Sequence, residues 1–352
     1  MGMQNLSYIG NKFSLLKWIT NCILQETGWN SFNDKYIGDL FSGSASVTFQ
    51  LRTLGARVLS NDTELFSAVL SGAAACGVYT EQVAEIIAKL NQELEEGGAV
   101  VGYITRNYSP VGGRKYWTEV NAKRIDFLRQ RIEQEYAGSE HYEFLLASLL
   151  QSADKVANCP AVYTSFFKEF QRTAERLLVL TPIHQESQAA HPKSNVRHVD
   201  VLKLELPSNL DAVYLDPPYN HRQYSKHYFP LNVVAMSPEK QEMLGVAKGK
   251  TGIPPNCYLS PFSSRTARVQ TKALKALLDK VAKDSSISWL FLSFSNQSTM
   301  SKAQVRALLE GYGQVVHVYR TEQRRYHAKH GGGCVVEYLF CLRVEQETPT
   351  GK

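Results

Sequence analysis

Short, nearly all-apolar runs that alternate with helical patterns constrain the fold of this chain more than any other feature of its sequence. Such runs are expected for strands that are buried on both faces of a sheet. Helical patterns at 13–26, 44–54, 64–76 and 268–283 stand between several of them, which predicts an α/β layer with a mostly parallel sheet. No helix separates the last two runs, so that pair could be antiparallel. The runs lie at 36–41, 57–60, 196–201, 212–215, 287–294, 314–319 and 334–342.

A long, mainly helical stretch interrupts this alternation between the second and the third predicted strand. Its helical patterns lie at 80–95, 118–136, 141–153 and 163–177. We therefore predict two domains: an α/β domain made of residues 1–76 and 191–352, and a helical domain at 77–190 inserted into it. A second interruption, at 237–268, contains Gly, Pro, Ser and Lys, and loops of that length are usually functional or disordered.

A turn of small residues follows the first predicted strand and precedes a helix, in the order Asp39-Leu40-Phe41-Ser42-Gly43-Ser44. Small residues allow a ligand to approach the backbone closely, and the start of a helix exposes N–H groups. Asp62 ends the second strand 62 − 39 = 23 residues after Asp39, a position at which an acidic residue typically accepts ribose hydroxyls. Asp62 could equally cap the next helix. The turn and Asp62 together favour a nucleoside cofactor, although the phosphate-binding P-loop and the G-x-G-x-x-G pattern are both absent.

The strongest local signal is Asp216-Pro217-Pro218-Tyr219, which directly follows the apolar run at 212–215. Two prolines end a strand and fix its backbone. The carboxylate is therefore held at the carboxyl end of a strand, where open α/β sheets bind their ligands. Tyr219 adds a flat aromatic face beside it. The plain alternative is a strand-end turn with a solvent-facing Asp.

This tetrapeptide resembles the signature of amino-group DNA methyltransferases in its adenine-N6 form. Tyr8-Ile9-Gly10-Asn11-Lys12 resembles the N-terminal cofactor motif of the Dam-like, or alpha (D12), class, and the order of motifs along the chain is the order of that class. The resemblance covers most of residues 5–342 and departs from its subgroup, the type II modification methylases, after Tyr224. Further segments that resemble this subgroup lie at 107–110, 114–118, 121–126, 153–158, 220–225 and 249–252.

The resemblance implies a Rossmann-like fold that binds S-adenosylmethionine, with an inserted helical target-recognition domain. Lys12 would approach the methionine end of the cofactor, although a lone lysine is often simply solvated. Asp200 would reach the cofactor adenine, or would cap a turn. The implied cofactor-binding residues are Tyr8, Lys12, Asp39, Phe41, Ser42, Gly43, Ser44, Asp62, Asp200 and Val201.

The same resemblance assigns catalysis to Asp216, Pro217, Pro218 and Tyr219. The lone pair of adenine N6 is delocalised into the ring, which makes N6 a poor nucleophile. The carboxylate of Asp216 and the carbonyl of Pro217 would each accept one N6–H bond, and the fixed negative charge would stabilise the positive charge that develops on N6. Tyr219 would stack on the base, which must leave the duplex to reach such a pocket. The sulfonium is already an activated donor, so no metal is expected.

The chain carries 39 Lys and Arg against 33 Asp and Glu, a net charge of +6 that permits a polyanionic partner. In the inserted stretch, the loop 106–117 is the better candidate for base reading, because Gly112-Gly113 would make it mobile. Within the helix pattern at 118–136, residues 123–131 could instead be a solvated face. The predicted DNA-binding residues are Arg106, Arg114, Lys115, Lys123, Arg324 and Arg325.

The sequence therefore predicts an enzyme that methylates adenine N6 in duplex DNA, alongside a separate cognate restriction endonuclease. The start of the chain lacks a signal-peptide layout and no apolar run reaches about 18 residues, which favours the cytoplasm of a bacterium or of a phage-infected cell. Two alternatives stay open: a methyltransferase acting on RNA adenine or cytosine N4, and a catalytically inactive DNA-binding subunit. Asp216 in place of Ser favours adenine, the large insertion favours duplex DNA, and the intact motifs argue against an inactive subunit.

Overall fold

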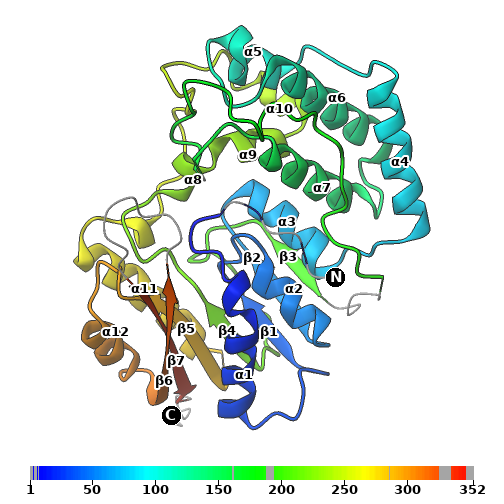
Figure 1. Ribbon diagram of the computed structural model, residues 1–352. Coiled ribbons are helices and arrows are strands. Elements are labelled where there is room, and N and C mark those ends of the chain that lie inside the picture. Colours follow the sequence, from blue (N-terminus) through cyan, green and yellow to red (C-terminus); the bar gives the residue numbers. More distant parts are fainter. Residues whose placement is uncertain are drawn as a thin grey trace.

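The computed structural model describes residues 3, 6, 8–160, 162–187, 194–284, 286–324 and 334–345, and its centre is one seven-stranded sheet (Figure 1). The strand order is β3-β2-β1-β4-β5-β7-β6. β1 pairs parallel with both β2 and β4, whereas β7 runs antiparallel to β5 and β6. The predicted α/β layer and the antiparallel final pair are both confirmed. The strands are β1 (Tyr36–Asp39), β2 (Arg57–Asn61), β3 (Asn195–Arg197), β4 (Ala212–Leu215), β5 (Trp289–Ser295), β6 (Gly313–Arg324) and β7 (Cys334–Val344).

The central strands are buried along their whole length because helices cover both faces of the sheet. Every residue of β1 and β4 is buried, which explains why their sequences are apolar rather than alternating. On one face, α1 (Leu16–Thr27) and α2 (Ser46–Thr53) share a hydrophobic cluster with Ile37 and Ala212. On the other face, α11 (Ala267–Ala282) and α12 (Lys302–Leu309) pack on Val213 and Leu215.

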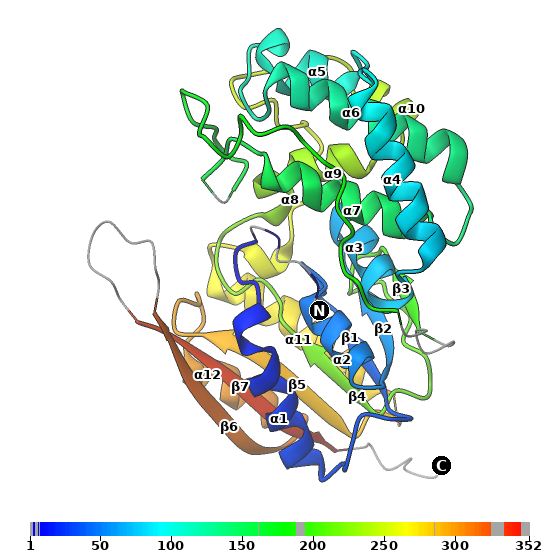
Figure 2. The same ribbon diagram turned by 45° about the vertical axis from the view of Figure 1, so that its right-hand side comes forward.

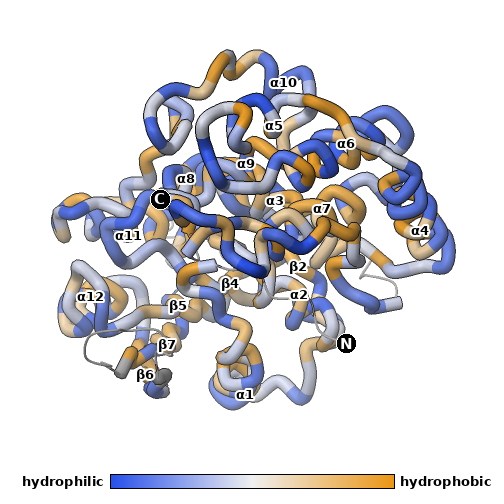
Figure 3. Tube along the Cα trace, turned by 45° about the horizontal axis from the view of Figure 1, so that its top comes forward, coloured by the Kyte–Doolittle hydropathy of each residue, from blue (hydrophilic) through white to orange (hydrophobic). Residues whose placement is uncertain are grey.

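The inserted helices form a second layer on one side of the sheet, above α3 and α8 in Figures 1 and 2. Their hydrophobic cluster includes residues of α3, such as Leu70, and of α9, such as Val234, so chain segments on both sides of the insertion take part. The hydropathy colouring in Figure 3 marks α7 as one of the apolar elements at this junction. The division at residues 76 and 190 stays a prediction. The helices concerned are α3 (Leu65–Ala75), α4 (Glu81–Glu95), α5 (Tyr103–Tyr108), α6 (Glu119–Tyr136), α7 (Tyr142–Lys155), α8 (Tyr224–His227), α9 (Phe229–Ala235) and α10 (Pro238–Glu242).

The helix predicted at 163–177 is wrong, because this segment wraps around one buried side chain. The amide nitrogen of Asn158 donates to the carbonyls of Lys115 (3.0 Å) and Phe167 (3.1 Å). Its amide oxygen accepts from the N–H of Gln171 at 3.0 Å. These tertiary hydrogen bonds hold 167–171 as irregular backbone and replace the bonds that a helix would make within itself.

The second interruption, 237–268, is an ordered strap rather than a free loop. It begins with α10 and passes the inserted helices, where Tyr103 and Tyr108 donate their hydroxyls to the carbonyls of Gly245 (2.7 Å) and Gly252 (3.1 Å). It then returns to the sheet through the 3-10 turn η3 (Pro261–Ser263). Two further 3-10 turns, η1 (Phe13–Leu15) and η2 (Pro110–Gly112), lie before α1 and after α5. None of the helices in the described part of the chain is long and apolar enough to cross a membrane.

Candidate active site

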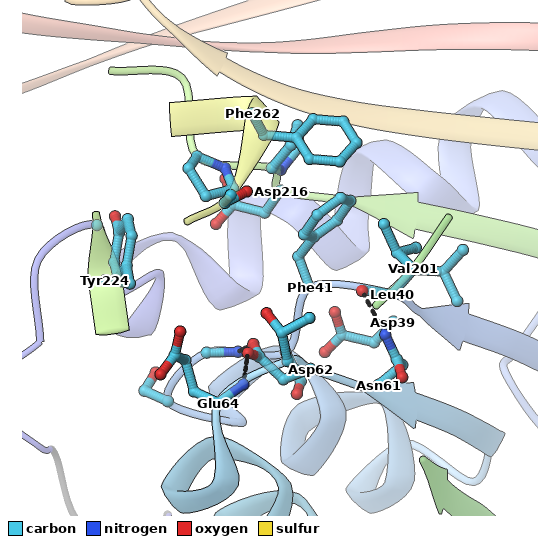
Figure 4. A pocket seen from close by; sticks show the side chains of 18 of the residues that line it. Asp39, Leu40, Phe41, Asn61, Asp62, Glu64, Val201, Asp216, Tyr224 and Phe262 are labelled. Atoms are coloured by element: carbon cyan, nitrogen blue, oxygen red, sulfur yellow. Dashed lines mark hydrogen bonds between the residues drawn. The ribbon is translucent and has the colours of Figure 1, made fainter. Parts of the chain in front are cut away.

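The main pocket lies where β1 and β4 pair side by side, at the carboxyl ends of both strands. This is the point at which the strand order reverses, and open α/β sheets bind ligands in that crevice. Figure 4 shows that Asp39, Asp62 and Glu64 approach the pocket from one side, while Phe41, Asp216 and Phe262 line another. The pocket therefore brings the Gly-containing turn and Asp216 into one space, although they lie far apart in the sequence.

The turn after β1 is held in an unusual backbone conformation by Asp62. The N–H of Gly43 donates to Asp62 Oδ2 at 2.8 Å, and the N–H of Ser42 donates to the carbonyl of Asn61 at 3.0 Å. Gly43 has a φ of 51° and Ala45 one of 59°, both in the left-handed region. A Cβ at Gly43 would lie 2.9 Å from a ring carbon of Tyr8. Only glycine suits this position, both for its φ and for the space available.

Asp62 also organises the start of the next helix, because its Oδ1 accepts from the N–H of Glu64 at 2.9 Å. The N-cap of α3 is Glu64, so the interpretation of Asp62 as the helix cap is wrong, and Asp62 instead holds the turn that leads into the helix. Its carboxylate lines the pocket at the same time, which keeps the ribose interpretation open as a proposal. Burial raises the pKa of Asp62 above its ordinary value, although these backbone hydrogen bonds oppose that shift.

Glu64 is a pocket residue that sequence reasoning did not select. It accepts hydrogen bonds from the hydroxyl of Ser225 and, at 2.6 Å, from the side-chain amide of Asn232. Burial raises the pKa of Glu64 to about 7, against the effect of these two donors. Its partners belong to α8 and α9, more than 160 residues away, so no local pattern could have revealed its role. Glu64 joins the pocket to the helices that follow β4.

Asp39 is 1% exposed and lies at the end of β1. Its Oδ2 accepts from the hydroxyl of Thr48 at 2.7 Å, whereas its Oδ1 is buried with no hydrogen-bond partner among the described residues. Burial raises the pKa of Asp39 to about 7, and the hydrogen bond from Thr48 opposes that shift. The unpartnered oxygen is an acceptor that can bind a ligand donor.

Asp216 forms a buried ion pair with Lys12, a contact that the sequence did not predict. Lys12 Nζ lies 2.7 Å from Asp216 Oδ2 and also donates to the carbonyl of Gly10 at 3.0 Å. Burial raises the pKa of Asp216, and the charge of Lys12 acts against that shift. Burial would lower the pKa of Lys12, but Asp216, together with Tyr219, Tyr214 and Glu337, outweighs burial and holds that pKa well above its ordinary value. The second oxygen, Oδ1, is buried and has no hydrogen-bond partner in the described part of the chain.

Tyr219 lies beside this pair, with its ring centre 5.8 Å from Lys12 Nζ. The ring meets Phe294 edge to face at 6.4 Å, and the Tyr219 carbonyl accepts from the N–H of Thr299 at 2.9 Å. Burial raises the pKa of Tyr219 to about 12, so its hydroxyl stays protonated at neutral pH. Pro217 and Pro218 also line the pocket, as the sequence predicts.

The N-terminal motif reaches the pocket through a stack of aromatic rings. The ring of Tyr8 stacks on Tyr228 with centroids 4.9 Å apart and lies 5.4 Å from the ring of Tyr224. The hydroxyl of Tyr228 accepts from the N–H of Ile9 at 2.7 Å. The helices α8 and α9 thereby position the segment that delivers Lys12.

The strap at 237–268 contributes the remaining wall of the pocket. The hydroxyl of Tyr258 donates to Asp200 Oδ2 at 2.9 Å, and the ring of Phe262 meets Phe41 edge to face at 5.1 Å. Asp200 Oδ1 accepts from the N–H of Leu202 at 3.0 Å, which is the turn-capping role considered for it. Val201 is buried beside the pocket. Sequence reasoning missed Tyr258 and Phe262, because nothing in the strap indicates where it returns to the sheet.

The prediction that Arg114 reads a base is corrected by the structure. Arg114 is buried, and its guanidinium donates to the carbonyls of Asn107 (2.8 Å), Gly112 (2.9 Å), Ala247 (2.9 Å) and Gly249 (2.7 Å). These bonds use both terminal nitrogens of the guanidinium, and its Nε is buried without a hydrogen-bond partner among the described residues, so no donor is available at the surface for a guanine edge. The segment 106–117 is also not a free loop, since it contains the end of α5 and the whole of η2.

The other predicted DNA contacts in the insertion also have partners within the chain. Arg106 pairs with Glu242, and Lys123 pairs with Glu119 at 2.6 Å along α6. Lys115 donates to the carbonyl of Lys168 at 2.6 Å. All three lie at or near the surface, so their contact with DNA stays a prediction. The side chain of Arg324 and the whole of Arg325 lie outside the described residues.

The fold and the site together define the class of S-adenosylmethionine-dependent amino-methyltransferases. They combine a turn of small residues, a strand-end carboxylate on a Pro-Pro turn, and one antiparallel strand in an otherwise parallel sheet. Comparison with known families gives the specific assignment. Residues 8–299 match the D12 class of N6 adenine-specific DNA methyltransferases, and the chain belongs to this family. The protein therefore transfers the methyl group of S-adenosylmethionine to N6 of adenine in DNA, on a Rossmann-like methyltransferase fold.

Similar proteins include methylases from a virus and from bacteria. The type II methyltransferase M.CviAII of Paramecium bursaria Chlorella virus 1 is 34% identical over 349 residues, which cover 98% of this chain and 100% of the relative. The type II methyltransferase M.NlaIII of Neisseria lactamica is 32% identical and covers 96% of this chain and 99% of the relative. The modification methylase LlaI of Lactococcus lactis is 28% identical, and the match covers 91% of this chain and 51% of that longer protein.

Proposed function

We propose that this protein is the modification methylase of a restriction–modification system, and that it methylates an adenine flipped out of duplex DNA against Asp216. The observation that carries this assignment is the state of the Asp216 carboxylate. Lys12 holds Oδ2, while Oδ1 is buried and has no hydrogen-bond partner among the described residues, and both Asp216 and Tyr219 line the pocket. An exocyclic amino group is a donor of the kind that this oxygen lacks.

The residues around the turn fit S-adenosylmethionine. Gly43 leaves room that a side chain would fill, and the carboxylates of Asp62 and Asp200 line the same pocket as acceptors for ribose and adenine donors. Phe41 offers an aromatic face between them. When bound, the cofactor supplies a methyl group that its sulfonium has already activated for transfer.

The roles of the protein's own groups follow from this geometry. Asp216 Oδ1 and the carbonyl of Pro217 would accept the two N6–H bonds, which draws the N6 lone pair out of conjugation. The fixed φ of Pro217 holds its carbonyl without reorganisation. Lys12 positions Asp216 and keeps it charged, and Asp216 stabilises the positive charge that develops on N6. Tyr219 stacks on the flipped base.

The relatives with type II and modification-methylase names support the proposed biological setting. In that setting a cognate restriction endonuclease cuts the same DNA sequence unless this protein has methylated it. We place the protein in the cytoplasm, where chromosomal or phage DNA is accessible.

The test is methyl transfer from labelled cofactor to duplex DNA. Asp216→Ala should lower the rate by about 10²–10³, the usual cost of losing one preorganised electrostatic contact. Lys12→Gln should lower the rate less, because the acceptor remains and only its position and charge are disturbed. Calorimetric binding of the cofactor should be retained in Asp216→Ala, since the Gly43 turn is intact.

The matched control is Asp34→Asn, an exposed residue just before the amino end of β1, whereas the pocket lies at the carboxyl end, and this variant should transfer methyl groups at the wild-type rate. Wild-type turnover in Asp216→Ala would overturn the assignment of the site. Transfer to RNA but not to duplex DNA would overturn the proposed substrate.

A further inference from the structure

A second cleft lies next to the active-site pocket and belongs to none of the roles described above. Its volume is about 650 Å³. It is formed by α8 and the residues before it on one side, and by residues 259–265 of the strap on the other. Gln223 lines both this cleft and the active-site pocket, so the two spaces share a wall.

The lining of this cleft is cationic. Arg222, Lys226 and Arg265 contribute three positive charges, with His221 and His227 beside them, and no carboxylate lines it. Among the described residues, the side chains of Arg222, Lys226 and Arg265 form no ion pair and no hydrogen bond. This differs from Arg106, Arg114 and Lys123, which are all engaged within the protein.

One buried donor–acceptor group in the cleft also lacks a partner. His227 Nδ1 is buried without a hydrogen bond in the described part of the chain. Burial lowers the pKa of His227, and the nearby Arg222 and His221 lower it further, so the imidazole is neutral at pH 7. A neutral imidazole with an open nitrogen can bond a ligand without adding charge.

The walls of the cleft are fixed relative to each other through Gln223. Its side-chain nitrogen donates to the carbonyls of Ser260 and Ser263, both at 3.2 Å, and its oxygen accepts from the N–H of Ser260 at 2.8 Å. The cationic residues therefore belong to segments that hydrogen bonds hold together, and not to free loops. Segments that are already ordered lose less conformational freedom when they bind an anion.

We propose that this cationic cleft binds phosphates of the DNA strand that carries the target adenine. Arg222 follows Tyr219 by three residues, so their Cα atoms are at most about 11 Å apart. That distance is about three base steps at 3.4 Å each along a strand. A strand whose adenine occupies the pocket therefore has its neighbouring phosphates within reach of Arg222, and Lys226 and Arg265 line the same cleft as Arg222. This inference rests on the DNA methyltransferase activity of the protein.

Phosphate contacts have a signature that separates them from other effects, namely salt dependence. Each phosphate contact contributes about 0.9 to the slope of log affinity against log salt concentration. The test measures binding of a mixed-sequence DNA duplex of about 30 base pairs by fluorescence anisotropy between about 50 and 200 mM salt. The variants are Arg222→Gln, Lys226→Gln and Arg265→Gln, singly and together.

Each single variant should lower the slope by about 0.9, so its loss of affinity is about threefold larger at the low-salt end than at the high-salt end. Arg222→Lys should restore most of the slope, because it restores the charge. Lys283→Gln is the matched control: it removes one exposed positive charge at the C-terminal end of α11, outside the cleft, and should bind DNA as the wild type does.

The triple variant should retain cofactor binding by calorimetry and an unchanged melting temperature, since the altered side chains form no ion pair or hydrogen bond with the residues that the structure describes. An unchanged salt slope in the triple variant would overturn the proposal, as would a loss of affinity for single-stranded RNA without a loss for duplex DNA. Methyl transfer by the wild-type protein and by Lys283→Gln tests the activity itself, so failure of the cleft proposal stays distinct from failure of the function.

Discussion

At the scale of single residues, the site gathers carboxylates that the fold buries without neutralising them fully. Asp39, Asp62, Glu64 and Asp216 all line one pocket, and burial raises the pKa of each. Among the described residues, Asp216 is the member of this group that forms an ion pair with a cation. Such an arrangement is costly for folding and useful for binding donors, which is typical of functional sites.

The burial of Asp39 should make the free energy of unfolding depend on pH in a measurable way. Its pKa in the folded protein is about 7, above the value of about 3.9 in an unfolded chain. The folded state therefore binds this proton more tightly. The resulting stabilisation is complete below about pH 4 and is lost as the pH rises through about 7. Asp39→Asn removes this dependence, so the stability of the variant relative to the wild type should increase from about pH 5 to about pH 8.

Urea unfolding of both proteins across this range measures the difference. The exposed Asp34→Asn is the control and should follow the wild type at every pH. A stability difference for Asp39→Asn that does not change with pH would contradict the raised pKa.

At the scale of elements, the strap at 237–268 connects the inserted helices to the cofactor side of the pocket. Arg114 ties Ala247 and Gly249 to the loop after α5, and Tyr258 and Phe262 lie further along the same strap. Arg114 thus holds the strap against the loop that follows α5. Ordered backbone of the strap therefore joins the loop after α5 to the wall of the pocket that contains Tyr258 and Phe262.

Arg114→Lys should release the strap from the loop that follows α5. A lysine has one nitrogen and cannot serve four carbonyls that belong to two segments, so about 1–3 kcal/mol of stability should be lost. Limited proteolysis should cut within 243–252 faster than in the wild type. Arg106→Lys is the control, because its ion pair with Glu242 is exposed and should be worth about 0.2–1 kcal/mol at most. Unchanged proteolysis in Arg114→Lys would show that the strap is held by other contacts.

At the scale of the whole molecule, the inserted helices and the sheet are not independent in their packing. One hydrophobic cluster contains Leu70 of α3, Leu150 of α7 and Val234 of α9. A shared core of this kind couples the unfolding of the parts that contribute to it.

We therefore expect a single thermal transition. Leu150→Ala should lower the melting temperature of the whole protein and cost about 2–5 kcal/mol, as large-to-small substitutions in cores do. Leu177→Ala is the control, because that side chain is 54% exposed and its truncation should have little effect. Two separate transitions, with only one moved by Leu150→Ala, would show that the predicted helical domain unfolds by itself.

The sequence by itself determined the elements whose signals are local. Buried strands such as β1 and β4 are apolar throughout, and the helices between them keep their period, so the sheet and its helices were predictable. The turn at Gly43 and the Asp-Pro-Pro-Tyr segment were predictable for the same reason, since strand ends and prolines fix the backbone within a few residues.

Only the tertiary structure decided which side chains meet. The hydrogen bonds of Asn158 hold part of 163–177, where a helix was expected, as an irregular segment. The guanidinium of Arg114 donates to four carbonyls and so does not read DNA bases. Lys12 forms an ion pair with Asp216, which is 204 positions away in the sequence. Glu64 likewise accepts hydrogen bonds from the distant Ser225 and Asn232. Hydrogen bonds and ion pairs between distant segments depend on how the helices and strands pack together. Residue patterns along the chain do not predict that packing, so these contacts could not be predicted from them. The cationic cleft became visible only because Arg222 and Arg265 converge from separate segments.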